Sequence, residues 1–153
     1  MLTGAQITIL HNAIVAEPTL TEAYMSANDS VIAAWLNTPV AEKAWLTNMT
    51  IGELHDVMDW TEFIGRSVAE KAAFTCMFVQ GLVNPSRLNI RNGINDIFSG
   101  TSQKTVNFRN AVLTAMQRPM KRAEKLMATG PVSGVYTLVY EGEIPREVIT
   151  SLY

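Results

Sequence analysis

The residues best suited to acid–base or metal chemistry lie together between positions 53 and 62. Glu53, Asp56 and Asp59 follow one another at intervals of three, so a helix would bring them to one face. The histidine–glutamate spacing of a zinc protease is missing, however, and the second histidine, His11, is far away in sequence. We therefore interpret the cluster as a solvated acidic face and expect no metal, no cofactor and no enzyme activity. The full cluster is Glu53, His55, Asp56, Asp59 and Glu62.

The second chemical feature is a basic segment, residues 87–125, which carries eight bases against two acids. Residues 1–86 carry nine acids against three bases, although the net charge of the whole chain is only −2. This separation favours head-to-tail self-association or docking on a charged partner. The simplest interpretation of the segment itself is a core helix with a basic outer face. The candidate interface bases are Arg87, Arg91, Arg118, Lys121, Arg122 and Lys125.

DNA binding is an alternative use of the basic segment. The sequence pI of about 5.7 and the few aromatic residues between the bases argue against a dedicated DNA-binding protein. Contact with DNA is therefore expected to be secondary to contact with protein.

Cys76 is the only cysteine, so no disulfide can form within the chain. Its apolar neighbours predict a small buried side chain, and Met77 and Val79 are predicted to be buried with it.

The low charge content and the tryptophans both indicate how the surface of the protein is used. Charged residues make up 17% of the chain, below the roughly 25% usual for soluble domains. Part of the surface is therefore expected to be an interface. Core anchoring is the first interpretation of the tryptophans and interface anchoring the second. They are Trp35, Trp45 and Trp60.

Capping patterns indicate that helices make up most of the chain. In each pattern a Thr or Ser is followed three residues later by Glu or Gln, which lets the two residues satisfy each other's free backbone N–H groups. The pairs are Thr3 with Gln6, Thr19 with Glu22, Thr50 with Glu53 and Ser67 with Glu70. Together with apolar periodicity and turn residues, they predict helices at 4–16, 19–27, 29–37, 41–47, 51–58, 67–80, 86–98, 102–117 and 119–128.

Residues 135–141, VYTLVYE, are β-branched and aromatic and predict the only clear strand. A single strand cannot satisfy its own backbone, so it needs a partner. The partner is either a second strand, around 47–51 or 59–64, or another copy of the chain that pairs by β-augmentation. The candidate interface residues here are Tyr136, Leu138 and Tyr140.

The expected fold is mainly α, a single-domain helical bundle over residues 1–130 followed by a C-terminal strand or extended arm over residues 131–153. Removal of the arm is expected to leave a folded helical monomer that no longer assembles. No membrane contact is expected, because no basic residue precedes Lys43 and the apolar runs fall far short of the roughly 20 residues that span a bilayer.

Several stretches of the chain resemble a family of small virion proteins from tailed bacteriophages and prophages. The resemblance covers most of the chain, but the sequence departs from the family pattern near 118–121 and 131–137. The stretches are MLTGAQIT (1–8), AWLTNMT (44–50), NPSRLNIRNGINDIFSG (84–100), RPMKRAEKLMATG (118–130) and LVYEG (138–142).

The resemblance implies a structural component of the virion, made in the cytoplasm of the bacterial host. Within that class we expect a head-to-tail connector, or adaptor, that forms a homo-oligomeric ring between the portal and tail proteins. The alternatives are a capsid decoration protein, a tail-tube subunit or a DNA-associated accessory protein.

Overall fold

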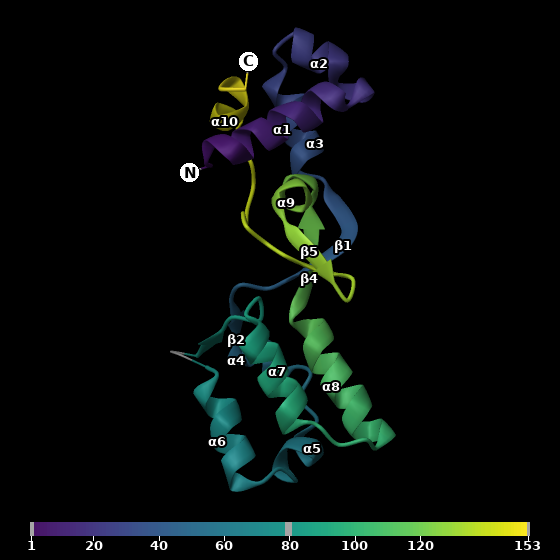
Figure 1. Cartoon of the computed structure of the whole chain (residues 1–153), viewed down its shortest axis with the longest axis vertical. Helices are drawn as coiled ribbons and strands as arrows, with labels where there is room; N and C mark the ends of the chain where they lie inside the picture. The colour runs from purple at the N-terminus through teal and green to yellow at the C-terminus, as the bar shows by residue number, and fades with distance from the viewer. Residues whose placement is uncertain (1, 79–80, 153) are drawn as a thin grey trace. The chain divides into compact units, whose positions relative to one another are not determined.

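The computed structural model describes residues 2–78 and 81–152, and the chain divides into two compact units (Figure 1). Unit 1 is formed by Met1–Ala44 together with Pro119–Tyr153, and unit 2 by Trp45–Arg118. Unit 2 is therefore an insertion in the chain of unit 1. This division differs from the expected helical domain over 1–130 with an arm over 131–153.

Helices form where the capping patterns predict them in most cases. The boxes at Thr3, Thr50 and Ser67 are confirmed, with both reciprocal hydrogen bonds in place. The pattern at Thr19 does not form a box, because the Glu17 carboxylate accepts the Thr19 N–H and caps the turn instead.

Unit 1 contains α1 (Gly4–Ala16), the 3-10 turn η1 (Pro18–Leu20), α2 (Thr21–Met25), α3 (Asp29–Asn37), α9 (Arg122–Met127) and α10 (Arg146–Thr150). Unit 2 contains α4 (Ile51–His55), α5 (Trp60–Ile64), α6 (Val68–Cys76), α7 (Leu88–Ile97) and α8 (Gln103–Ala115). The predicted end of the sixth helix, residue 80, lies outside the described residues.

Strands make the fold mixed α/β, so the prediction of a mainly α helical bundle is wrong. A four-stranded mixed sheet has the order β4-β1-β6-β5, and β2 pairs with β3 in a two-stranded antiparallel sheet. The strands are β1 (Pro39–Trp45), β2 (Met49–Thr50), β3 (Leu82–Val83), β4 (Gln117–Lys121), β5 (Thr129–Val132) and β6 (Val135–Thr137).

Strand β1 replaces the helix predicted over 41–47. The residues Ala-Glu-Lys-Ala favour a helix locally, but this segment is an inner strand with hydrogen-bonded neighbours on both sides. Pairing across the sheet therefore overrides propensity. The same error affects 119–128, where β4 comes first and the helix begins only at Arg122.

Strand β6 finds both of its partners within the chain. It pairs in parallel with β1, where Lys43 faces Val135, and antiparallel with β5, where Thr129 faces Thr137. Both suggested partners are therefore wrong, since 59–64 contains α5 and β2 pairs with β3. An inner strand also has no free edge for β-augmentation.

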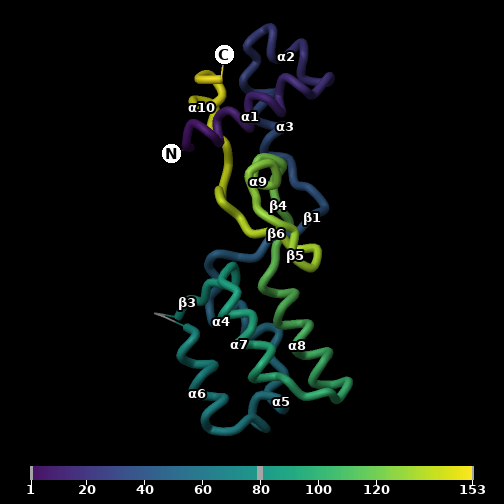
Figure 2. Tube along the Cα trace, in the orientation of Figure 1, coloured from purple at the N-terminus to yellow at the C-terminus, as the bar shows by residue number. Residues whose placement is uncertain are grey.

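The β5–β6 hairpin turns on only two residues, and the trace reverses sharply there (Figure 2). Ser133 has φ 52° and Gly134 φ 79°, so both central residues are left-handed, as in a type I′ turn. This backbone twist matches the twist of the two strands it joins.

Residues 131–153, predicted as a C-terminal strand or extended arm, contain strand β6, but the segment after it packs into the unit 1 core instead of extending as an arm. Ile144, Ile149 and Leu152 are buried in one cluster with side chains of α1 and α3. The Asn37 side chain forms two hydrogen bonds with the backbone of Ile144. Its Nδ2 donates to the Ile144 carbonyl (3.1 Å), and its Oδ1 accepts the Ile144 N–H (2.9 Å). The buried Glu124 carboxylate accepts the Gly142 N–H (2.9 Å).

Unit 2 has a separate core built on aromatic contacts. Phe98 makes an edge contact with Phe108 (centroids 4.8 Å apart) and another with Phe74 (6.1 Å). Helix α7 contacts both α6 and α8, so it is the central helix of this unit. Its apolar face, with Ile94 and Ile97 buried, makes the contacts that hold the unit together.

Candidate functional site

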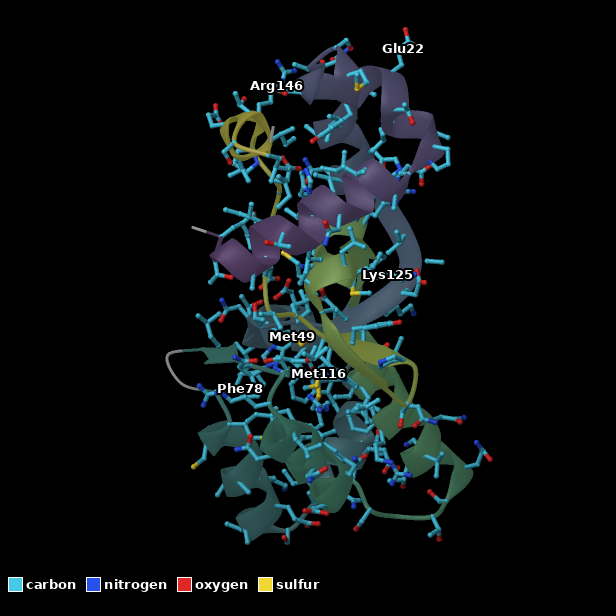
Figure 3. All side chains as sticks on the ribbon, turned by 45° about the horizontal axis from the view of Figure 1, so that its top comes forward. Glu22, Met49, Phe78, Met116, Lys125 and Arg146 are labelled. Carbon is cyan, nitrogen blue, oxygen red and sulfur yellow. The ribbon has the colours of Figure 1, made fainter. Side chains whose placement is uncertain are left out.

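The two predicted interface lysines of unit 1 form ion pairs within their own unit. Lys121 Nζ lies 3.0 Å from Glu143 Oε1, and Lys125 Nζ pairs with Glu42 Oε1. Figure 3 shows Lys125 beside β1, the strand that carries Glu42. The hydrogen bond between Lys125 and Glu42 raises the pKa of Lys125 and lowers the pKa of Glu42. These two lysines are not available to an acidic neighbour without breaking a pair.

Two of the predicted interface arginines stack on tryptophans. The Arg122 guanidinium lies 4.3 Å from the Trp35 ring centroid and donates to the Trp35 carbonyl at 3.1 Å. The Arg91 guanidinium lies 4.5 Å from the Trp45 ring and donates from Nη1 to the carbonyl oxygens of residues 85 and 86, both at 2.7 Å. Burial lowers the pKa of Arg91. Both arginines therefore stabilise the local structure of their own unit.

The strand residues predicted at the interface are also partly covered. Tyr136 and Leu138 are half-buried. Tyr140 Oη donates to the Glu143 carbonyl at 2.6 Å, and burial raises its pKa. Arg118 in β4 is half-buried as well.

Arg87 is the one residue of the nine predicted interface residues that is exposed rather than half-buried. It precedes α7 as the N-cap residue. Throughout residues 2–78 and 81–152, it has no ion-pair partner. This side chain is free to meet a carboxylate from another molecule.

The acidic cluster proves to be partly an internal ion network. Lys104 Nζ lies 3.4 Å from Asp59 and 3.8 Å from Glu62, and Arg66 lies 3.6 Å from Glu62. The hydroxyl of the buried Thr105 donates to Glu62 at 2.9 Å. The Glu62 side chain is only 12% exposed, so the solvated-face interpretation is wrong for this residue. Among the described residues, no group of three His, Cys, Asp or Glu side chains could hold a metal ion.

A pocket of about 520 Å³ opens on unit 2, beside Arg87. Cys76 is exposed at this pocket, so the prediction that it is buried is wrong: α6 presents it to the outside, while Phe74 on the same helix enters the core. Met77, also predicted to be buried, is half-buried, and Val79 lies outside the described residues. The pocket is lined by Asn48, Cys76, Met77, Leu82, Val83, Asn84, Arg87 and Ile90, with no carboxylate among them.

The charge separation seen in the sequence survives folding in two places. Residues 2–41, which include α1, α2 and α3, contain three acids and no Lys or Arg. Residues 71–95, which include all of the described pocket lining except Asn48, contain three bases and no acid. Elsewhere, the ion pairs described above bring opposite charges together.

Exposed apolar side chains accompany both charged surfaces. Met25 at the end of α2 is 80% exposed, and Leu88 next to Arg87 is 61% exposed. Sequence reasoning missed Met25 and its neighbour Glu22. The missing bases before Lys43 were a signal that could have identified this acidic surface.

Within the described residues, the arrangement offers a cation without an ion-pair partner beside open apolar surface, which are features that protein docking surfaces use. No helix in the described part of the chain is long and apolar enough to cross a membrane. Comparison with protein-family models, with curated proteins and with solved structures finds no match in any of the three.

Proposed function

We propose that the chain is a structural, non-enzymatic subunit of a tailed-phage virion, a head-to-tail connector that forms a homo-oligomeric ring between the portal and tail proteins. The sequence resemblance supports the virion class. The observation that carries the connector role is the separation of an acidic surface on α1–α3 from the basic pocket surface around Arg87.

A ring requires this kind of asymmetry. Each subunit of a ring uses two different surfaces, one for each neighbour, so the surfaces have to complement each other rather than themselves. Opposite charges at two different sites of one chain meet this requirement, and exposed apolar side chains at both sites add area to bury.

The DNA-associated alternative has less support than the sequence suggested. Lys121 and Lys125 are paired with carboxylates, and Arg91 and Arg122 donate to carbonyl groups of their own unit. A phosphate backbone would have to compete with these contacts.

The test is quantitative peptide mass spectrometry on purified virus particles, scaled to the portal protein. A small fixed copy number comparable to that of the portal supports a connector. A copy number in step with the major capsid or tube protein would indicate decoration or the tail tube. Absence from the particle would overturn the virion proposal.

A further inference from the structure

We propose that α2 of one copy docks on the pocket of unit 2 in the next copy, with Glu22 paired to Arg87 and Met25 inserted beside Cys76. This inference rests on the self-association in the proposed function and names the two surfaces that make each joint.

Helix α2 presents an acid and an apolar side chain together. Glu22 and Met25 are three residues apart on this helix, so they share a face. Glu22 is exposed and extends away from the ribbon (Figure 3), and it has no ion-pair partner within residues 2–78 and 81–152. Because α1, α2 and α3 contain no Lys or Arg, their own residues leave the negative charge of Glu22 uncompensated.

The pocket offers the matching chemistry. Its apolar lining comes from Met77, Leu82, Val83 and Ile90, and the exposed Arg87 lies among them. Arg91, four residues after Arg87 and outside the pocket lining, bonds carbonyl oxygens rather than carboxylates. An arginine with no carboxylate near it in sequence or in the pocket lining is suited to accept one from a second molecule.

The two sites match in polarity, and the Met25 side chain suits an open apolar pocket. Methionine is unbranched and flexible, so it can fill an irregular apolar cavity, and the pocket of about 520 Å³ is open to solvent. The fork of Arg87 can bind the Glu22 carboxylate with two parallel hydrogen bonds. Because the two sites belong to different surfaces of one chain, the contact is heterologous and repeats from copy to copy.

The native Cys76 allows a direct test by crosslinking. Met25→Cys places a second thiol on α2, and mild oxidation should yield a ladder of disulfide-linked multimers on non-reducing gels. The same variant with Cys76→Ser should give no ladder beyond a dimer, because the thiol introduced on α2 could then bond only to its counterpart in one other copy. Val68→Cys, at a residue that is 84% exposed on α6, is the matched control and should give no ladder.

Charge reversal tests the ion pair independently. Glu22→Arg and Arg87→Glu should each weaken self-association by at least about tenfold in analytical ultracentrifugation, and the double variant should restore it. Lys71→Glu is the matched control for a change of charge outside the pocket lining and should leave association within about twofold. Circular dichroism checks that each variant is folded.

The outcomes separate this inference from the proposed function. Assembly that is unaffected by either reversal, together with no ladder from Met25→Cys, would overturn the α2–pocket contact, while a portal-like copy number would leave the connector proposal standing. A chain that stays monomeric at all concentrations would overturn the contact as well, whatever its copy number in particles.

Discussion

At the scale of single residues, arginines hold loops and helix ends of unit 2 in place. Arg66 donates to the Ile97 carbonyl, and Arg109 donates to the Phe98 carbonyl at 2.7 Å. A guanidinium group offers five donors in a rigid plane, so one side chain can satisfy several carbonyl groups that no helix or strand pairs. Within the basic segment 87–125, Arg91, Arg109 and Arg122 make such bonds to carbonyl groups of their own unit.

Arg91→Lys is expected to lower the free energy of unfolding by about 1–2 kcal/mol, because lysine cannot bond two adjacent carbonyls and stack on Trp45 at once. Arg87→Lys, one helical turn away and exposed, is the matched control and should change stability by less than about 0.5 kcal/mol. Urea denaturation followed by tryptophan fluorescence measures both. Equal effects of the two changes would show that Arg91 has no clamping role.

Carboxylates in the helix caps make stability depend on pH. The pKa of Glu53 is lowered below its ordinary 4.5, chiefly by the hydrogen bond from the Thr50 N–H and then by the Thr50 hydroxyl. A carboxyl whose pKa is lower in the folded chain adds stability above its unfolded pKa and loses it as the pH falls through the folded value. Glu17, Glu42, Asp59 and Glu70 are shifted in the same direction.

We therefore expect the melting temperature to fall as the pH drops below about 4.5. Glu53→Gln should be less stable than the natural chain at neutral pH, and the difference should shrink in acid, where the natural side chain is protonated too. Differential scanning calorimetry across this range measures the effect. A difference that stays constant with pH would show that charge at Glu53 contributes nothing.

At the scale of elements, the sequence predicts helices well where the signal is local. The boxes at Thr3 and Ser67 and the bounds of α1 and α3 follow from residues a few positions apart. Strand β1 could not be found in this way, because Ala-Glu-Lys-Ala becomes a strand through pairing with β4 and β6, which lie some seventy to ninety positions later. Strand β5 was missed because Gly130 and Pro131 disfavour a strand, although proline is tolerated at a sheet edge.

Gly134→Ala is expected to destabilise unit 1 by about 1 kcal/mol, because φ at this position is 79° and a Cβ disfavours that conformation. Ser133→Asn should be neutral or slightly stabilising, because asparagine tolerates the left-handed region and Asn-Gly is the preferred type I′ pair. Chemical denaturation of the two variants tests the turn. A loss of stability in Ser133→Asn that equals the loss in Gly134→Ala would contradict it.

At the scale of the whole molecule, the C-terminal segment decides whether unit 1 can form. Sequence reasoning treated it as a strand or extended arm because residues 135–141 are β-branched and aromatic and had no evident partner strand. Its apolar residues nevertheless complete the core around Leu10 and Leu36. Sequence reasoning identified Arg87 for the candidate site but not α2. The sequence does not show which charged side chains are exposed in the folded chain, or which of them form ion pairs.

Removal of residues 131–153, which the sequence suggested would leave a folded monomer, is therefore expected to unfold or aggregate unit 1. Ile149→Ala, a milder change at a fully buried side chain, should cost about 2–5 kcal/mol. Glu147→Ala, exposed on the same helix, is the control and should cost less than about 0.5 kcal/mol. A shortened chain with a natural melting temperature would show that this segment is not part of the core.

The nesting of unit 2 within unit 1 sets an order of events during synthesis. A ribosome completes Trp45–Arg118 before any residue of the second half of unit 1 exists, so the inner unit can fold while the outer one is still unfinished. Strands β1 and β4 flank the insertion and are neighbours in the sheet. Folding of the inner unit first replaces a long flexible loop between them by a compact body, which lowers the entropic cost of bringing the strands together. The unit that carries α2 is thus the last of the two to be completed, so a folded α2 surface is available only after residues 119–153 have been synthesised.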